Sequence, residues 1–350
     1  MARLLRIQRA DAWYHLTARG NEQRSIYRDD RDRRHFLELL PGCLERFRAR
    51  LHAYVLMDNH YHLLLETREA NLSRAMQWLN TSYIVWFNRR HRRAGHLFQG
   101  RFKAIIVEPE TWGLGLSRYI HLNPVRVKRL GLDKAAQRAQ RHVASEAPEP
   151  EVIQARLEEL REYRWSSYRA YAGLETPPSW LHCATVLALG GGRPKERGQH
   201  YRRDVENAVR EGLAERPWEG LVARLALGSQ EFFEQLMAQP VNGEAGQALK
   251  EALDERPSFA AVMKVIERLK EEPWSKFADR HGDWGRDLAL YLGRELCGLT
   301  LPELGAQVRG RSAMAVSMAL KRLSSRLERD KTLVAWLQEA KRTLSGGTDS

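Results

Sequence analysis

Hydrophobic and polar positions at the start of the chain alternate first with the period of a strand and then with that of a helix. Residues 11–19 have a strand-like apolar core and end at Gly20, a residue that favours turns. Residues 29–47 place apolar side chains three and four positions apart, and Pro41 is expected to kink or break the helix that this spacing predicts. The pattern therefore predicts a strand followed by a helix.

The next segment has the pattern of a hairpin. Two short apolar runs, residues 51–57 and 60–65, are separated by Asp58 and Asn59, a pair that favours turns. Residues 72–88 then return to helical spacing and end in a basic cluster. We expect two antiparallel strands followed by a second helix.

The order of elements is completed by one more strand and helix. Strand chemistry returns over residues 97–107 and leads into a helix-like segment at residues 111–122, which Pro124 closes. The predicted order, β-α-β-β-α-β, is that of the ferredoxin-like unit, in which an antiparallel sheet carries its helices on one face and leaves the other available. The predicted fold class is therefore α+β, with an all-helical region towards the C-terminus.

The amino-acid composition of the remaining segments indicates where domains begin and end. An acidic, alanine-rich stretch at about residues 133–162 indicates a partly helical surface insert rather than core. Proline and glycine cluster at residues 176–197 and indicate a boundary. We therefore predict a first domain over residues 1–178, a helical connecting region over 179–283 and a C-terminal domain over 284–350.

The charge balance favours an anionic partner. The 350 residues include 57 Lys and Arg against 44 Asp and Glu, a formal charge of +13, and the pI is about 9.8. This balance suits nucleic acid, but it also suits an acidic membrane surface or a merely soluble basic protein. Because no apolar run has the length of a bilayer span or the form of a secretory signal, we expect a cytoplasmic, nucleoid-associated protein without a membrane partner.

Two histidines in the predicted hairpin suggest a metal site. His60 and His62 are two positions apart in a strand, so both imidazoles project from the same sheet face. That geometry can hold one metal ion, but pairs with this spacing also arise by chance. Taken alone, the pair is a weak signal.

Tyr119 and Asn123 are four positions apart beyond the last predicted strand. Tyr119 has two interpretations, a nucleophile for a metal-polarised phosphodiester or a packed aromatic with its hydroxyl on a backbone carbonyl. Asn123 shares the face of Tyr119 if the helix continues, and its amide oxygen could then complete a coordination shell. Because Pro124 disfavours helical geometry at the preceding residue, Asn123 could instead be a helix cap.

Basic residues near these positions form a possible phosphate track. Strand alternation over residues 97–107 puts Gln99, Arg101 and Lys103 on one face. The cluster that ends the second helix could extend this track, although arginine runs are more often merely solvated. That cluster comprises Arg89, Arg90, Arg92 and Arg93.

Several motifs in order resemble one known family, the REP-associated tyrosine transposases, which belong with insertion-sequence-200-like transposases among HUH endonucleases. The motifs are WYHLTARGN, LHAYVLMDNHYHLLLE, GHLFQGRFKA, RYIHLNPVR and YRWSSYRAY. The resemblance implies that His60 and His62, with Asn123 as a possible third ligand, bind Mg²⁺ or Mn²⁺. It also implies that Tyr119 attacks single-stranded DNA hairpins and forms a 5′-phosphotyrosine. Arg19 and Arg126, which lie in these motifs, are assigned to DNA contacts.

Two features depart from the family pattern. Tyr61 stands between the histidines in place of an aliphatic residue, and the acidic insert lengthens the path from RYIHLNPVR to YRWSSY. Neither departure removes a reactive group, so they affect DNA docking more than chemistry.

The C-terminal domain has a helix-turn-helix pattern. Thr300 and Glu303 have the spacing of a capping box, Gly310 marks a turn, and residues 313–327 have the spacing of an amphipathic helix. The segment is similar to the DNA-binding domain of the bacterial replication initiator DnaA, which implies binding to duplex DNA through residues such as Arg311. A small helical bundle that only packs on a neighbour can have the same pattern.

The sequence thus predicts a transposase that cleaves single-stranded DNA and transfers the strand. The alternative from another class is a DNA-binding regulator that has kept the scaffold without the chemistry. RNA processing is less well supported, because tyrosine attack on phosphate does not exploit a 2′-hydroxyl. The oligomeric state does not follow from the sequence.

Overall fold

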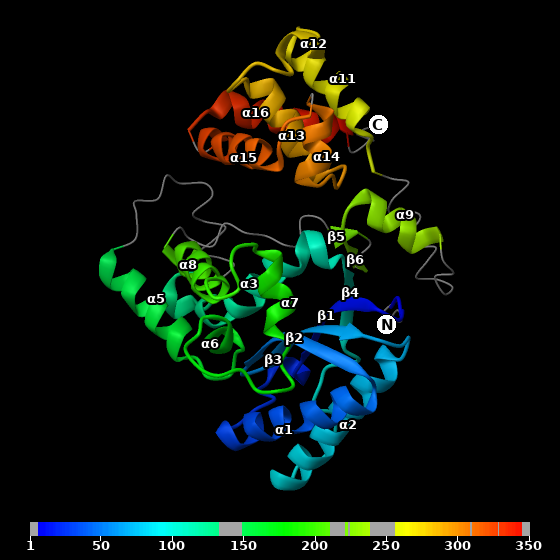
Figure 1. The fold of residues 1–350 in the computed structure, drawn as a ribbon, viewed down its shortest axis with the longest axis vertical. Helices are drawn as coiled ribbons and strands as arrows, with labels where there is room; N and C mark the ends of the chain where they lie inside the picture. The colour runs from blue at the N-terminus through cyan, green and yellow to red at the C-terminus, as the bar shows by residue number, and fades with distance from the viewer. Residues whose placement is uncertain are drawn as a thin grey trace. The chain divides into compact units, whose positions relative to one another are not determined.

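A computed structural model describes residues 6–132, 149–210, 221–222, 225–238, 256–308, 310–327 and 329–344. These residues form two compact units, of which the first ends at residue 227 and the second begins at residue 228 (Figure 1). The predicted boundaries after residues 178 and 283 stay predictions. Among the described residues, no helix has both the length and the apolar character that a membrane crossing requires.

The first unit is built on an antiparallel sheet with the strand order β2-β3-β1-β4. This is the order expected of the ferredoxin-like unit, and the α+β prediction is confirmed. Two short strands that the sequence pattern did not predict extend the sheet beyond β4, where β6 pairs with β4 in parallel and with β5 in antiparallel fashion. The strands are β1 Ala12–Arg19, β2 Ala49–Met57, β3 His60–Thr67, β4 Lys103–Val107, β5 Leu221–Val222 and β6 Ala226–Leu227.

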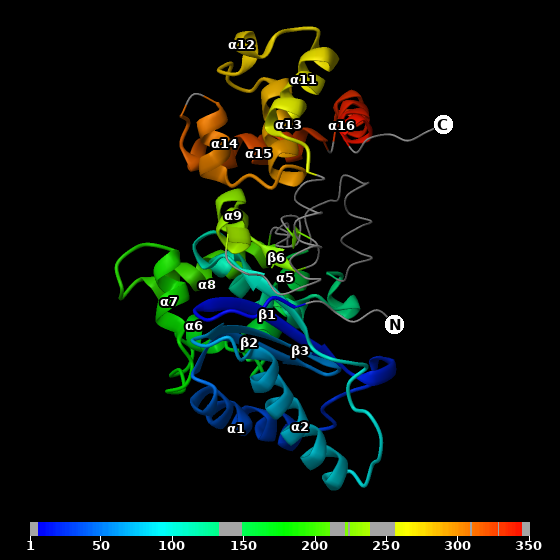
Figure 2. The same ribbon diagram turned by 90° about the vertical axis from the view of Figure 1, so that its right-hand side faces the viewer.

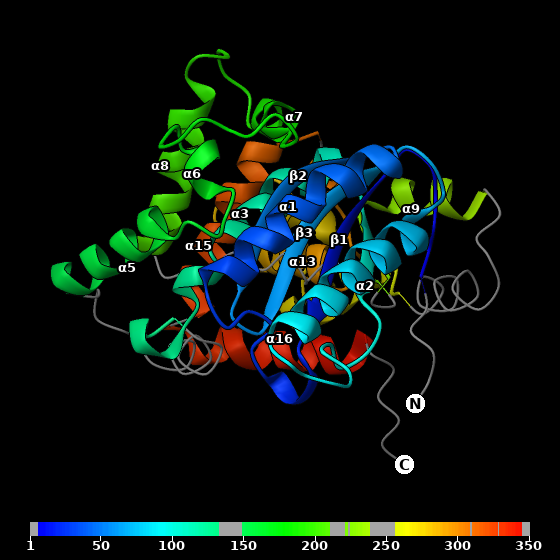
Figure 3. The ribbon, with the colours of Figure 1, turned by 90° about the horizontal axis from the view of Figure 1, so that it is seen from below.

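One face of the sheet is covered by α1, Asp30–Arg46, and α2, Leu72–Arg90 (Figure 2). Their apolar sides pack with inward-facing aromatic rings of the sheet, and the ring centroids of Phe36 and Tyr61 are 5.0 Å apart. Seen from below, both helices run across the strands (Figure 3). Pro41 does not break α1, which continues to Arg46.

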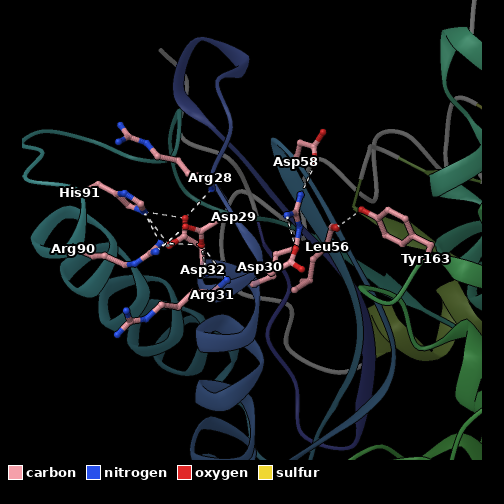
Figure 4. Close-up of polar contacts among 11 residues, drawn as sticks. Arg28, Asp29, Asp30, Arg31, Asp32, Leu56, Asp58, Arg90, His91 and Tyr163 are labelled. Atoms are coloured by element: carbon pink, nitrogen blue, oxygen red, sulfur yellow. Dashed lines mark hydrogen bonds and ion pairs between the residues drawn. The ribbon is translucent and has the colours of Figure 1, made fainter.

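An ionic cluster joins the start of α1 to the end of α2 (Figure 4). The Asp29 carboxylate caps α1 by accepting hydrogen bonds from two backbone N–H groups. Arg90 forms ion pairs with Asp29 and with buried Asp32, and His91 lies 2.9 Å from the Asp32 carboxylate. The carboxylates therefore offset the positive charge at the end of α2.

The other face is covered by helices that follow β4. α3 packs on β2 and β3, α7 packs on α3, and α5 and α6 both pack on α8. The insert is helical at α5, as expected, but α5 is not only a surface element, because it buries Leu157 and Leu160 and packs on α8. Residues 133–148 of that insert lie outside the described residues. The helices are α3 Leu114–His121, α5 Pro150–Glu162, α6 Tyr168–Tyr171, α7 Cys183–Leu189 and α8 Arg197–Arg210.

The strand predicted over residues 97–107 is shorter than expected. Only Lys103–Val107 forms β4, and Phe98 contributes a single bridge to Gly20. Gly95 has φ of +89°, which glycine adopts without strain and which does not fit a strand. A π-helical turn, Pro109–Gly113, then replaces the first turn of the predicted last helix.

The second unit is all-helical, as predicted. α13 lies between α11 and α15, and buried Leu288, Leu292 and Leu323 belong to one apolar core. The predicted capping box is present, because Thr300 and Glu303 exchange side-chain to backbone hydrogen bonds at the start of α14. The helices are α9 Gln230–Ala238, α11 Phe259–Lys270, α12 Trp274–Phe277, α13 Trp284–Glu295, α14 Leu301–Gln307, α15 Ala313–Leu327 and α16 Lys331–Leu344.

Candidate active site

The strand register places three histidines on the sheet face that α3 covers. In the pairing of β1 with β3, Thr17 lies opposite His62 and Arg19 lies opposite His60. Because side chains alternate across a strand, His15 projects from the same face as Thr17 and therefore from the same face as His62. The ring centroids of His60 and His62 are 5.0 Å apart, as are those of His15 and His62.

The same alternation explains why Tyr61 does not obstruct the pair. Its ring points to the opposite face, where it is fully buried, and its hydroxyl donates to Oδ1 of Asn80 on α2 over 2.7 Å. Burial raises the pKa of Tyr61 well above the ordinary value. Tyr61 is therefore a core residue under α1 and α2, and the departure from the family pattern lies away from the histidines.

His62 is buried and joined to His15. Its Nδ1 atom lies 2.8 Å from Nε2 of His15, and both rings are almost completely shielded from solvent. Burial lowers the pKa of His15 to about 3, and burial together with neighbouring positive groups holds the pKa of His62 well below its usual value. Both rings are therefore neutral near pH 7, and a neutral ring is the form that binds a metal.

A hydrogen bond also orients the ring of His60, the first residue of β3. Its Nδ1 atom lies 2.7 Å from Oδ1 of Asn59, an acceptor, so Nδ1 carries the proton and Nε2 carries the lone pair. A metal-binding imidazole commonly donates its other N–H in this manner. The arrangement of His60 and His62 thus fits a divalent ion bound through the two Nε2 atoms.

The imidazoles of His60 and His62 alone do not complete the coordination shell of a divalent ion. Among the described residues, no three or more His, Cys, Asp or Glu side chains form a group that could hold a metal ion. An ion on His60 and His62 would therefore need further oxygen ligands, from an amide, water or a phosphate. Such an ion would have coordination positions left for a substrate oxygen.

Tyr119 on α3 lies against the histidines. Its ring meets His62 edge-on, with centroids 5.8 Å apart, and meets His15 in the same way at 6.3 Å. The guanidinium carbon of Arg126 lies 5.0 Å from the centroid of the Tyr119 ring. The structure therefore brings together the predicted nucleophile, the predicted metal ligands and a predicted DNA contact.

Asn123 caps the helix that carries Tyr119. Its amide Nδ2 donates to the carbonyl oxygens of Tyr119 and Ile120 over 2.8 and 3.3 Å. The cap uses the amide nitrogen, whereas a metal would bind the amide oxygen, so the cap and the ligand role are compatible. The role of Asn123 as a ligand stays a prediction.

Helices later in the chain hold α3 in place. His121 is fully buried, with Nδ1 2.7 Å from the Tyr201 hydroxyl and Nε2 2.7 Å from Oγ of Ser167. Arg118 forms an ion pair with Asp204 over 2.6 Å. Tyr201 and Asp204 both belong to α8, so α8 fixes the orientation of α3 at two points.

The predicted DNA contacts have different surroundings. Arg19 and Arg126 are close enough to His62 to lower its pKa, so their charges lie at the site. Gln99, Arg101 and Lys103 are exposed, as predicted, although only Lys103 belongs to a strand. At the end of α2, Arg89 and Arg92 are exposed, whereas Arg90 is ion-paired and Arg93 bonds Asn88 and the His96 carbonyl. Arg311, in the second unit, donates to the Asp279 carbonyl.

His15 is the site residue that the sequence reasoning missed. Spacing within one strand pairs His60 with His62, whereas His15 comes from a different strand. The signal that identifies it is the register of β1 against β3, which places His15 on the face of His62. The motif WYHLTARGN contains His15, but spacing alone gives no partner for it.

Comparison with known proteins gives the context of this site. No curated protein matches the chain. Among solved structures, a REP-associated tyrosine transposase bound to a REP hairpin matches with a TM-score of 0.36 and 12% identity, over 52% of this chain and 92% of that one. The family model described as "Transposase IS200 like" matches residues 8–123, a segment that contains Tyr119 and the three histidines of the site, His15, His60 and His62, and ends at Asn123. Residues 8–123 are therefore similar to the IS200-like transposases.

Proposed function

We propose that this protein cleaves single-stranded DNA at hairpin or palindromic sequences and transfers the cut strand through a 5′-phosphotyrosine at Tyr119. The observation that carries the proposal is the edge-on approach of Tyr119 to His62, with ring centroids 5.8 Å apart, on the sheet face that also presents His60. A nucleophile and a pair of metal-binding rings therefore meet on elements of one compact unit.

The residues of the site have separate tasks. His60 and His62 hold Mg²⁺ or Mn²⁺, and Asn123 is the proposed third ligand. When bound, a divalent ion polarises the phosphate and offsets its charge. Arg19 and Arg126 place positive charge beside the same position.

The proposed reaction exchanges one phosphorus–oxygen bond for another. The Tyr119 oxygen forms a bond to phosphorus while the bond from phosphorus to the 3′-oxygen breaks. The phenol proton passes to solvent, and the departing 3′-oxygen takes up a proton. The reverse attack by a 3′-hydroxyl on the phosphotyrosine restores a phosphodiester, so strand transfer needs no external energy source.

A hairpin oligonucleotide labelled on the strand 3′ to the cut tests this reaction. Wild-type protein with Mg²⁺ or Mn²⁺ is expected to form a covalent adduct that survives denaturing electrophoresis. Tyr119→Phe removes the nucleophilic oxygen and should abolish the adduct, and His60→Ala should abolish it at every metal concentration. Equal adduct formation by wild type and Tyr119→Phe, or its absence from wild type across many hairpins, would contradict the proposal.

The same assay separates the competing functions. Tight, salt-sensitive binding without cleavage would favour a DNA-binding regulator, because phosphate contacts survive loss of the chemistry. Competition between matched DNA and RNA hairpins tests the choice of nucleic acid. We also propose that the second unit binds duplex DNA, with Arg311 among its contacts, and mobility shifts of Arg311→Ala with duplex DNA test this part separately.

A further inference from the structure

His15 lies at the centre of the sheet, next to the proposed metal ligand. Strand β1 pairs on one side with β3 and on the other with β4, where His15 is opposite Leu64 and Ile105 respectively. Its side chain is 3% exposed, and its Nε2 atom lies 2.8 Å from Nδ1 of His62. A buried polar ring in such a place usually has a hydrogen-bonding task.

We infer that His15 is a positioning residue that fixes the ring orientation and the proton position of His62. The inference rests on the proposed function, in which Nε2 of His62 binds the metal. It adds a residue whose effect on the metal acts entirely through another side chain.

The position of the proton between His15 and His62 decides which nitrogen of His62 can bind a metal. Two imidazole nitrogens at 2.8 Å share one proton, so one of them donates and the other accepts. If Nε2 of His15 donates, neutral His62 carries its proton on Nε2 and cannot bind a metal there. If Nδ1 of His62 donates, His62 presents a lone pair on Nε2 and neutral His15 carries its proton on Nδ1. Metal binding through Nε2 therefore requires His15 to act as the acceptor.

The other proposed ligand, His60, is oriented in the same way, but by the side chain of Asn59 instead of a histidine. Nδ1 of His60 donates to Oδ1 of Asn59, which lies in the turn between β2 and β3. His15 is instead held in the middle of the sheet between two neighbouring strands. Because its backbone is fixed by strand pairing on both sides, His15 constrains the His62 ring more rigidly than a turn residue constrains His60.

Three variants of the full chain test the inference with Mn²⁺ as the probe. His15→Phe keeps an aromatic ring of similar size but removes the acceptor, and we expect the Kd for Mn²⁺ to rise about 10- to 100-fold. His15→Gln places an amide oxygen within reach of Nδ1 of His62, so its Kd should stay within a few-fold of wild type. His60→Ala, which removes a ligand, is the control for loss of binding. Calorimetry and Mn²⁺ electron paramagnetic resonance measure the affinity.

A nitrogen-15 NMR spectrum of the imidazoles gives a readout that a merely structural role would not move. We expect His62 in wild type to carry its proton on Nδ1 when Mg²⁺, which is diamagnetic and does not broaden the signals, is bound, and the fixed tautomer to be lost in His15→Phe. Since this measurement on wild type needs no substitution, it stays informative if His15→Phe does not fold. A bound His62 protonated on Nε2 would overturn the inference.

The outcomes distinguish this inference from the proposed function. Wild type that binds Mn²⁺ but forms no DNA adduct contradicts the proposed reaction and leaves the role of His15 standing. Equal Mn²⁺ affinity of wild type and a folded His15→Phe overturns the role of His15, even where cleavage is observed. Equal impairment of the Phe and Gln variants also overturns it, because the acceptor would then not be what matters. Wild type that binds no Mn²⁺ overturns both.

Discussion

The amide of Asn123 has two ends that serve different purposes in the proposed site. The nitrogen caps α3 through the carbonyl oxygens of Tyr119 and Ile120, and the oxygen is the proposed metal ligand. Asn123→Ala removes both functions, so we expect it to weaken Mn²⁺ binding and to lower the free energy of unfolding by about 1 kcal/mol. Asn123→Asp keeps a ligand oxygen but loses the N–H donors, so it should retain Mn²⁺ binding while losing stability.

Metal titrations and urea unfolding of these two variants separate the roles. If Asn123→Ala binds Mn²⁺ with the affinity of wild type, Asn123 is only a cap. Weakened binding in both variants would indicate that the orientation of α3, rather than a ligand atom, matters for the metal.

Tyr61 offers a matched control from the other side of the sheet. Tyr61→Phe removes a buried hydroxyl whose hydrogen bond to Asn80 is 2.7 Å long, and we expect the free energy of unfolding to fall by about 1–3 kcal/mol. Because the ring faces α1 and α2, adduct formation on a DNA hairpin should be unchanged under conditions in which the variant is folded. A large loss of cleavage by folded Tyr61→Phe would show that the two faces of the sheet are coupled.

Single residues show what sequence spacing can and cannot supply. His60 and His62 could be placed on one face because they belong to one strand, where alternation is a local rule. His15 could not be paired with them in advance, because its contact depends on the register between two strands. The exposure of Gln99 and Arg101 was predicted correctly although the strand was not, since Phe98 and Phe102 are buried beside them.

At the scale of elements, α3 depends on α8, which lies outside the segment matched by the family model. The Tyr201 hydroxyl contacts Nδ1 of His121 over 2.7 Å and Oγ of Ser117 over 2.9 Å, and all three residues are buried. Tyr201→Phe leaves buried polar atoms on α3 with one partner fewer, which should cost about 1–3 kcal/mol. We expect adduct formation to slow much more than Mn²⁺ affinity falls, because the proposed ligands His60 and His62 lie on β3, whereas Tyr119 lies on α3 and only the proposed third ligand, Asn123, follows that helix.

Stopped-flow cleavage and Mn²⁺ titration of Tyr201→Phe measure the two effects side by side. An unchanged cleavage rate in the folded variant would mean that α3 is held sufficiently by Arg118 and Asp204. A parallel loss of metal affinity would mean that α8, by holding α3, also positions Asn123 or the histidines of the sheet.

Glu206 links α8 to α5 and makes the stability of this layer dependent on pH. Burial raises the pKa of Glu206, but its ion pairs with Arg161 and Arg202 outweigh that effect and lower the pKa to about 2. The unfolded chain takes up this proton near pH 4.5, so the stabilisation is present above that pH and is lost as pH falls towards 2. We expect Glu206→Gln to be less stable than wild type by about 1–3 kcal/mol at pH 7, with a smaller difference at pH 3. Urea unfolding at both pH values measures this change, and a constant difference would contradict the assignment.

The elements that the sequence predicted best are those with long, regular patterns. The first three strands and the first two helices of the sheet layer were placed within a few residues, because their periodicity extends over two or more turns or pleats. β5 and β6 comprise two residues each, too few for any period to appear. Pro41 lies within α1 despite its missing N–H, because burial of Phe36, Leu40 and Leu44 on the same helix outweighs the cost of one hydrogen bond.

At the scale of the whole molecule, the basic residues behind the formal charge of +13 do not all have the same capacity to bind phosphate. Arginines held by carboxylates, such as Arg90 with Asp29 and Asp32, contribute little to a phosphate track. Lys103 is exposed on the face of the histidines, where no carboxylate of the described residues forms an ion pair with it. If the protein binds DNA as proposed, counterion release will depend on which arginines and lysines contact phosphates rather than on the net charge.

Lys103 and Arg90 test this distinction as a matched pair. Lys103 is opposite Thr17, which is opposite His62, so Lys103 lies about 10 Å from the His62 backbone across two strand spacings on the site face. In a Tyr119→Phe background, where the proposed cleavage cannot occur, hairpin affinity should fall linearly with the logarithm of salt concentration. Lys103→Ala should reduce the magnitude of that slope by about 0.7, the value for one phosphate contact on a single strand, for hairpins of any sequence.

Arg90→Ala should leave the salt slope unchanged and instead destabilise the protein, because it leaves buried Asp32 with one cation fewer. Fluorescence anisotropy at four or more salt concentrations measures both slopes, and thermal unfolding measures both stabilities. If Arg90→Ala reduces the slope and Lys103→Ala does not, the DNA strand follows the end of α2 and leaves the histidine face. Binding would then be separated from the proposed chemistry, because α2 covers the sheet face opposite to Tyr119.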